Sequence, residues 1–130
     1  MRVVLGLGLA VVLAGGAMAQ DVPVEVAVLK GQKITLHVHS FLSDEELVML
    51  RLVQTNRQAL QLFVTSGGFS AIAVSPDDGF VRGGGLVPSA IAMGDLPDAG
   101  AAAEAALKGC DAARKGSAPC VVVLEVGPVK

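Results

Sequence analysis

His37 and His39 are the side chains that come closest to a chemical site in this sequence. They alternate with Val38, so a strand here places both imidazoles on one face. Two imidazoles can begin a Zn or Cu site, but the chain has no other histidine. Further ligands have to come from carboxylates such as Glu25 on the neighbouring strand. Exposed strand histidines without a metal are the alternative interpretation.

Two other groups of residues suggest a ligand, and ordinary turns explain both. Asp77, Asp78 and Asp95 could attract calcium, yet their spacing matches no EF-hand loop, and Asp is common in turns that contain Pro and Gly. Gly83–Gly85 is not followed by the Gly-Lys-Ser/Thr of a phosphate-binding loop. We therefore expect no bound cofactor.

The sequence also lacks a catalytic set. Ser40 follows His39, but neighbours on a strand point to opposite faces and cannot act as nucleophile and base. Nothing else assembles a nucleophile, a base and a charge stabiliser. We predict no catalytic residues and a protein that is not an enzyme.

Residues 1–19 have the layout of a cleavable secretory signal. Arg2 precedes an apolar run from Val3 to Ala14, and the small residues Ala17-Met18-Ala19 end the segment. A membrane anchor is the alternative, but the apolar run is shorter than the roughly 20 residues that span a bilayer. The segment carries one arginine and no acid, so cleavage after Ala19 changes the net charge from −2 to −3. We expect a periplasmic or secreted protein that leaves the membrane once the signal is removed.

The two cysteines, Cys110 and Cys120, both follow this segment. An even number of cysteines in an oxidising compartment predicts a disulfide. A redox or nucleophilic cysteine is the alternative, but it needs a nearby base or a CxxC spacing, and neither is visible in the sequence. Closing so short a loop stabilises the fold by about 2.5–3 kcal/mol on the chain-entropy model.

Length and composition narrow the classes of function. The 130 residues suffice for one compact domain, which we place at 20–130. The chain has no Trp or Tyr and its basic residues are scattered, so it offers neither a stacking platform nor a positive patch. We expect no nucleic-acid partner and consider a periplasmic protein the candidate partner.

Residues 22–41 predict a β-hairpin. The alternation of Val22, Val24, Val26 and Val28 with other residues indicates a half-buried strand. Lys30-Gly31-Gln32 turns the chain. The next strand places Ile34, Leu36 and Val38 on one face and Thr35, His37 and His39 on the other.

A helix is predicted to begin at the capping box Ser43-Asp44-Glu45-Glu46. Its expected buried side consists of Val48, Met49, Leu52, Val53, Ala59, Leu60, Phe63 and Val64. The centre around Thr55 is a weak helix former, so a strand before Thr55 and a shorter helix after it stay open as the alternative.

The second half of the chain predicts three strands and a helix. Residues 69–74 read as a buried strand, 75–79 as a tight turn and 80–82 as an antiparallel return. The Gly-rich stretch 83–97 is either a mobile or binding loop or contains a short strand at 90–93. Asp98 caps a helix over 99–115, and residues 120–126 form a central strand. The helix is expected to bury Ala103, Ala106, Leu107, Cys110 and Ala113.

Three segments carry a resemblance: Phe69–Gly79, Ala101–Cys110 and Ala118–Leu124. In them the chain is similar to small exported alphaproteobacterial proteins of unknown function. It also resembles, more loosely, a secreted bacterial family that combines an alanine-rich helix ending in Cys with a strand beginning in Cys. The resemblance implies the Cys110–Cys120 bridge and implies no activity.

Some of these similar proteins carry the name 5-aminolevulinate synthase. That pyridoxal-phosphate chemistry needs a large fold with a Schiff-base lysine and a partner for the pyridinium nitrogen. An exported chain of this size with five lysines does not supply that architecture.

The order of elements predicts an α+β domain with two layers. We expect a mostly antiparallel sheet with two helices on one face. A ferredoxin-like βαββαβ core covers Lys33–Val126, and the Val22–Val28 strand adds to an edge. The predicted function is a non-enzymatic interaction or accessory module. The alternative is a small-ligand or metal binder that uses His37 and His39 or the 83–97 loop.

Overall fold

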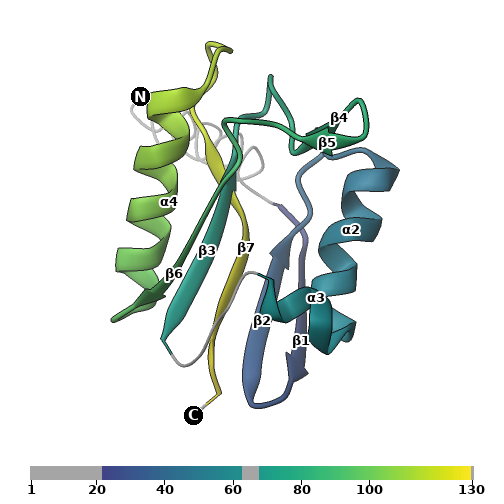
Figure 1. Ribbon diagram of the computed structural model, residues 1–130, viewed down its shortest axis with the longest axis vertical. Helices are drawn as coiled ribbons and strands as arrows, with labels where there is room; N and C mark the ends of the chain where they lie inside the picture. Colours follow the sequence, from purple (N-terminus) through teal and green to yellow (C-terminus); the bar gives the residue numbers. More distant parts are fainter. Residues whose placement is uncertain (1–21, 63–67, 130) are drawn as a thin grey trace, which may run out of the picture.

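The computed structural model describes residues 22–62 and 68–129, which form a sheet with helices on both sides (Figure 1). The predicted secretory signal lies outside the described residues. The elements in chain order are strands β1 (Val24–Leu29) and β2 (Gln32–His37), helices α2 (Asp44–Thr55) and α3 (Arg57–Gln61), strands β3 (Phe69–Val74), β4 (Val81–Arg82), β5 (Gly85–Leu86) and β6 (Ile91–Leu96), helix α4 (Ala99–Ala113) and strand β7 (Val121–Pro128).

The main sheet has five strands in the order β1-β2-β7-β3-β6, and every neighbouring pair is antiparallel. The α+β class, the antiparallel sheet and the N-terminal edge strand are confirmed. The ferredoxin-like strand order is wrong, because that arrangement places the first and third strands of the core at the centre. In this structure the core strands are β2, β3, β6 and β7, in chain order. The central ones are β3 and β7, which are the second and the fourth.

The helices cover opposite faces of the sheet, so the prediction of two layers with both helices on one face is also wrong. Side chains alternate along β3. Ile72 and Val74 pack in a cluster with Leu50 and Val53 of α2, whereas Ala71 and Ala73 pack with residues of α4, among them Ala106. In Figure 1 the sheet accordingly stands between α4 on the left and α2 and α3 on the right. The cluster against α4 is built largely from alanines, which lets that helix approach the strands closely.

The β1–β2 hairpin is confirmed, and Lys30 and Gly31 form its two-residue turn. Both have positive φ, 51° and 77°, as the type I′ turn of a tight hairpin requires. Ile34 and Leu36 share one face of the strand as predicted, and both are fully buried there against α2. The strand ends at His37.

Residues 44–61 form two helices instead of one helix or a strand with a helix. The capping box is present: the Ser43 hydroxyl accepts from the Glu46 N–H at 3.1 Å, and Glu46 accepts from the Ser43 N–H at 2.8 Å. Asn56 ends α2 and caps α3, where its side chain accepts from the Ala59 N–H at 3.0 Å. The chain therefore breaks one residue after Thr55.

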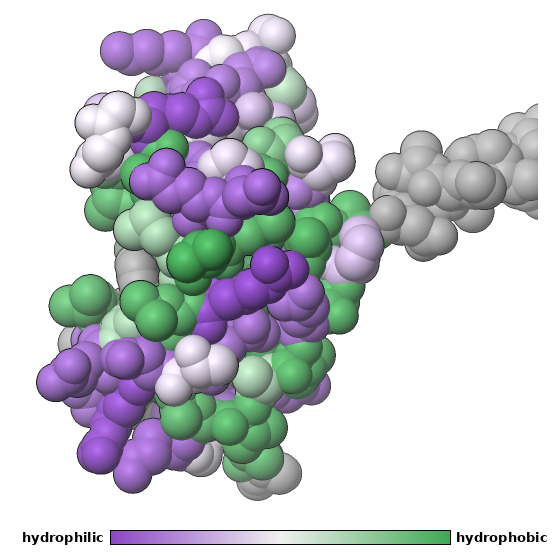
Figure 2. All heavy atoms as spheres, turned by 90° about the vertical axis from the view of Figure 1, so that its right-hand side faces the viewer, coloured by the Kyte–Doolittle hydropathy of each residue, from purple (hydrophilic) through white to green (hydrophobic). Residues whose placement is uncertain are grey.

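The face of α2 that packs on the sheet differs from the predicted face. Glu46, Leu50, Val53 and Gln54 are buried. Val48, Met49 and Leu52 were expected in the core but are 64%, 42% and 48% exposed. Figure 2, which views the molecule from the side of α2, shows apolar side chains among hydrophilic ones across this surface. Phe63 and Val64 lie outside the described residues.

The physical reason is that two polar side chains of α2 bond to distant backbone. Glu46 accepts from the N–H groups of Phe80 and Val81, and the Gln54 amide donates to the carbonyls of Glu25 and Ile34. These bonds fix the rotation of the helix, and they satisfy polar groups that are costly to bury unpaired.

The segment that follows β3 also differs in part from the prediction. The Ser75–Gly79 turn is confirmed, but β4 then pairs with β5 in a separate two-stranded sheet and not with β3. The antiparallel neighbour of β3 on that side is β6. The predicted short strand at 90–93 is thus the beginning of β6.

Helix α4 begins as predicted, because Asp98 accepts from the Ala101 N–H at 2.8 Å. It ends at Ala113, earlier than expected. Its buried residues are Ala102, Ala106 and Cys110, while Ala113 is exposed. β7 is central as predicted: it places buried Val123, Leu124 and Val126 toward α2 and partly buried Val122 toward α4.

Candidate functional site

Half of the sheet face that carries α4 has no helix over it among the described residues. Helix α4 packs over β3, β6 and β7, whereas α2 lies against β1 and β2 from the other face. Directly opposed residues of antiparallel strands share a face. The strand register therefore places seven side chains on the uncovered part, which we call the open sheet face: Val24, Val26, Val28, Lys33, Thr35, His37 and Glu125.

The edge of the open sheet face is a ridge of three valines. Val24, Val26 and Val28 are 50%, 55% and 64% exposed. The alternation in β1 was predicted correctly, but the valine side was expected to be buried. The opposite side, with Glu25, faces α2 instead, where both carboxylate oxygens of Glu25 accept from Arg51 at 2.9 and 2.8 Å. The position of α2 thus decides which side of β1 is covered.

A groove of about 250 Å³ runs beside this ridge, between β2 and the first turn of α4. Its polar side chains are Lys33, Thr35, Ser70 and Glu125, and Phe69 and Ala99 form part of its apolar wall. Gly127 lies at the floor, where a Cβ would come within 2.5 Å of the Phe69 ring. A glycine is therefore required there for the ring to lie against the strand.

His37 and His39 lie close together at the end of β2, with ring centroids 6.4 Å apart. His37 Nε2 lies 2.7 Å from a carboxylate oxygen of Glu125. His39 lies beyond the strand, and its Nε2 lies 3.1 Å from the carbonyl oxygen of Val122. Burial and the charge of His37 lower the pKa of His39, and the bond to Val122 opposes them only in part. Both imidazoles thus have protein partners.

The expected carboxylate ligand, Glu25, lies on the other face of the sheet and binds Arg51. Glu125 is the acid beside the histidines, and no local sequence pattern could predict this because His37 and Glu125 are 88 residues apart. Within residues 22–62 and 68–129, no group of three or more His, Cys, Asp or Glu side chains is arranged to hold a metal ion.

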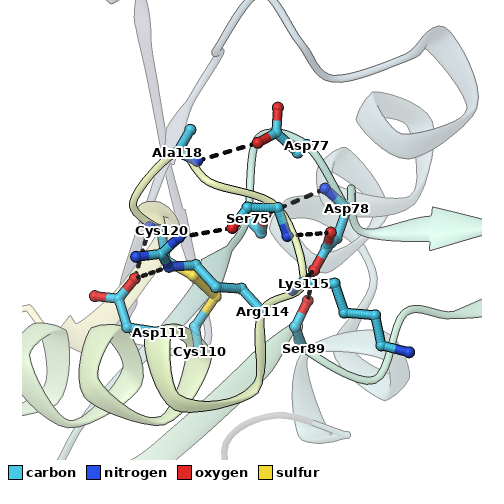
Figure 3. A network of polar contacts seen from close by, with 11 residues as sticks. Ser75, Asp77, Asp78, Ser89, Cys110, Asp111, Arg114, Lys115, Ala118 and Cys120 are labelled. Carbon is cyan, nitrogen blue, oxygen red and sulfur yellow. Dashed lines mark hydrogen bonds and ion pairs between the residues drawn. A yellow bond between two sulfur atoms is a disulfide. The ribbon is translucent and has the colours of Figure 1, made fainter.

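The disulfide between Cys110 and Cys120 is present and joins the last turn of α4 to the start of β7, with a Cα–Cα distance of 6.1 Å. Both cysteines are buried. The bridge ties the alanine-rich helix to the central strand, and it lies inside the polar network of Figure 3.

Carboxylates hold the loop between the two cysteines (Figure 3). Asp78 accepts from the backbone N–H groups of Lys115 and Gly116 and from the Ser89 hydroxyl, at 2.8, 3.1 and 2.9 Å. Asp111 accepts from the Cys120 N–H at 2.9 Å. The bond from Lys115 is the largest of several that lower the pKa of Asp78, and the bond from Cys120 likewise lowers the pKa of Asp111.

The calcium hypothesis for Asp77, Asp78 and Asp95 gains no support from this arrangement. Asp77 accepts from the Ala118 N–H at 3.1 Å, so it binds the same loop as Asp78. Asp95 belongs to β6, where it has a positive φ of 60°. The paired aspartates therefore anchor the disulfide loop.

The 83–97 segment is largely folded. Gly83 and Gly84 form the turn between β4 and β5, and Ser89 is buried with its hydroxyl on Asp78. A cavity of about 200 Å³ lies between residues 87–89 and the end of α4. Its one carboxylate, from Asp78, is already bonded to the Lys115 backbone and to Ser89, so this cavity is a weaker candidate site than the open sheet face.

Comparison with protein-family models, with curated proteins and with solved structures finds no match for this chain. The resemblance to small exported proteins therefore stays a prediction. No helix in the described part of the chain is long and apolar enough to cross a membrane.

Proposed function

We propose that the protein is an exported, disulfide-stapled interaction module without enzymatic activity, and that its open sheet face binds a protein partner. The observation that carries the proposal is the ridge of Val24, Val26 and Val28, each at least 50% exposed on an edge strand. Contiguous apolar patches on an exposed surface mark interaction sites.

Export is supported by two independent features. Residues 1–19 follow the pattern of a secretory signal. The bridge between Cys110 and Cys120 is a bond that persists in oxidising compartments and is rare in the cytosol.

A binding role is supported by the way in which the ridge and the groove combine. The valines offer apolar contact, and Lys33, Thr35 and Glu125 beside them offer polar groups that can fix the orientation of a partner. Binding surfaces combine an apolar centre with a polar rim in this way.

The experiment is site-specific photo-crosslinking in cells that express the full chain. A crosslinker at Val26 is expected to capture a protein, and a crosslinker at Val48 on the outer side of α2 is the control with similar exposure. The mass of the uncrosslinked protein, recovered without reductant, should equal residues 20–130 less two hydrogens. Absence of any protein adduct at Val26 would overturn the binding role, and an uncleaved chain with free thiols would overturn export.

A small-ligand or metal binder is the second candidate, and the groove of about 250 Å³ and the adjacent histidine pair favour it. Native mass spectrometry of the recovered protein distinguishes it. A metal adduct that is lost in the double variant His37→Ala/His39→Ala supports the metal form. An organic adduct that persists in this variant and is lost in Lys33→Ala supports a ligand in the groove.

A further inference from the structure

The two edges of the main sheet differ in how well they are protected against pairing. β6 pairs irregularly with β3: Ala71 lies opposite Met93 and Phe69 opposite Leu96, and Asp95 between them has a positive φ. Such bulges bend an edge and hinder further pairing. β1 has no irregularity in its register with β2 over six residues, and Glu25 is its one charged residue. The regular edge is therefore the one that can accept another strand.

The hairpin geometry shows which backbone groups of β1 face outward. The residues that flank a two-residue turn, Leu29 and Gln32, form a hydrogen-bonded pair, and such pairs alternate along the strands. The Val38 N–H donates to the Pro23 carbonyl at 2.8 Å, which agrees with this alternation because Pro23 and Val38 are also an expected hydrogen-bonded pair. The odd-numbered residues of β1 thus bond to β2. The N–H and C=O groups of Val24, Val26 and Val28 point away from the sheet.

The same three valines therefore supply both the outward hydrogen-bonding groups and the exposed apolar ridge. We propose that β1 pairs antiparallel with β1 of a second copy of this chain, about a two-fold axis at Val26. This inference rests on the proposed function and names the partner. Val26 then lies opposite Val26 of the partner subunit, and Val24 opposite Val28 of the partner subunit.

A second copy fits this edge because one register pairs all three outward-facing valines of β1 with the valines of β1 in the other copy. With the axis at Val26, all three outward-facing residues meet outward-facing residues, and each opposed pair exchanges two hydrogen bonds. Glu25 then lies opposite Ala27 of the partner subunit and keeps its hydrogen bonds to Arg51 of its own chain. In a continuous sheet with this two-fold axis, the α2 faces of both copies lie on the same side. Side chains alternate along a strand, so the next possible registers are shifted by two residues.

Both neighbouring registers are worse. In one of them Glu25 faces Glu25 of the partner subunit, and like charges directly opposite each other destabilise a sheet. In the other, Val24 faces the turn residue Lys30 of the partner subunit and one valine pair is lost. The charge at Glu25 and the length of β1 therefore select one symmetric pairing, which joins two five-stranded sheets into one.

The test measures the mass of the recovered full-chain product by sedimentation over a wide range of concentration. The wild type is expected to change from monomer to dimer as concentration rises. Val26→Lys places two like charges at the axis and should abolish the dimer at every concentration. Val48→Lys is the matched control at a valine of similar exposure and should leave the dimer unchanged. Equal unfolding midpoints of the two variants exclude misfolding as the cause.

Cysteine crosslinking checks the register. Val26→Cys should form a disulfide dimer alone, whereas Val24→Cys and Val28→Cys should form one only when they are mixed, since opposed Cα atoms lie about 5.5 Å apart. A wild type that stays monomeric, or a dimer that Val26→Lys does not affect, would overturn the inference. If the crosslinker at Val26 captures a different protein and no second copy, the inference fails and the proposed function stands. If Val26 captures nothing, both fail.

Discussion

Glu46 connects the start of α2 to the chain that leaves the Ser75–Gly79 turn. Its side chain is fully buried and accepts from three backbone N–H groups, those of Ser43, Phe80 and Val81. Burial alone would raise the pKa of Glu46, but these three bonds and the nearby Arg82 outweigh it and lower the pKa. A buried carboxylate that is fully bonded stabilises the fold in its ionised form.

Replacing Glu46→Gln should lower the free energy of unfolding by about 1.5–3 kcal/mol, since an amide cannot accept all three bonds and hydrogen bonds to a charged group are the strong ones. Urea unfolding at neutral pH measures this. Glu45→Gln, at the exposed neighbouring position, is the control and should have little effect.

The stability difference between the wild type and Glu46→Gln should also depend on pH. Because the native pKa of Glu46 lies below its ordinary value of 4.5, the stabilisation is complete above that pH and is lost as the pH falls through the native pKa. The stability difference between wild type and Glu46→Gln should therefore shrink in acid. A difference that stayed constant down to low pH would contradict this role of the carboxylate.

Asp78 is the residue that holds the loop between the cysteines. In Asp78→Asn one carboxylate oxygen becomes an amide, so the bonds from Lys115 and Gly116 cannot both be kept. Hydrogen exchange at these two amides should become faster, while exchange within α4 stays unchanged. Asp44→Asn, at an exposed position, is the control. Unchanged exchange at residues 115 and 116 would show that the disulfide alone holds the loop.

At the scale of elements, the disulfide and the packing of α4 are coupled. Cys110 is fully buried in the alanine-rich cluster, and Cys120 directly precedes the central strand β7. The double variant Cys110→Ala/Cys120→Ala should lower the free energy of unfolding by about 2.5–3 kcal/mol, because a loop of this length is freed in the unfolded chain. Urea unfolding of the oxidised wild type, the reduced wild type and the variant measures the effect. Equal stability of all three would mean that the aspartate anchors are sufficient.

For the whole molecule, the placement of helices on opposite faces has one main consequence. α2 covers the β1 side on one face and α4 covers the β6 side on the other, so part of each face has no helix over it among the described residues. The uncovered part beside α4 is the open sheet face with its valine ridge. The binding surface that we propose is thus a result of how the layers are arranged.

This arrangement predicts a pattern of hydrogen exchange along β1 in dilute protein. The amides of Val24, Val26 and Val28 face outward and should exchange fast, whereas those of Glu25 and Ala27 bond to β2 and should exchange slowly. At high protein concentration, hydrogen exchange at these three outward-facing amides should become slower if two copies pair through β1. The reverse alternation in dilute protein would contradict the hydrogen-bond phase on which the pairing register depends.

Features that depend on residues a few positions apart could be predicted from the sequence. The capping box at Ser43, the Asp98 cap, the turns at Lys30–Gly31 and Ser75–Gly79 and the Cys110–Cys120 bridge were all predicted and are present. Each of them is decided by local backbone geometry or by a short loop. The α+β class followed from the order of these elements.

Which side of each element is buried, and how the strands are ordered, depends on long-range packing. A hydrophobic period shows that an element has two sides, but not which side a partner will cover. On α2 the hydrogen bonds of Glu46 and Gln54 to distant backbone turned Val48 and Leu52 outward, and on β1 the position of α2 left the valines exposed. These outcomes depend on contacts between segments far apart in the chain, which local pattern does not encode.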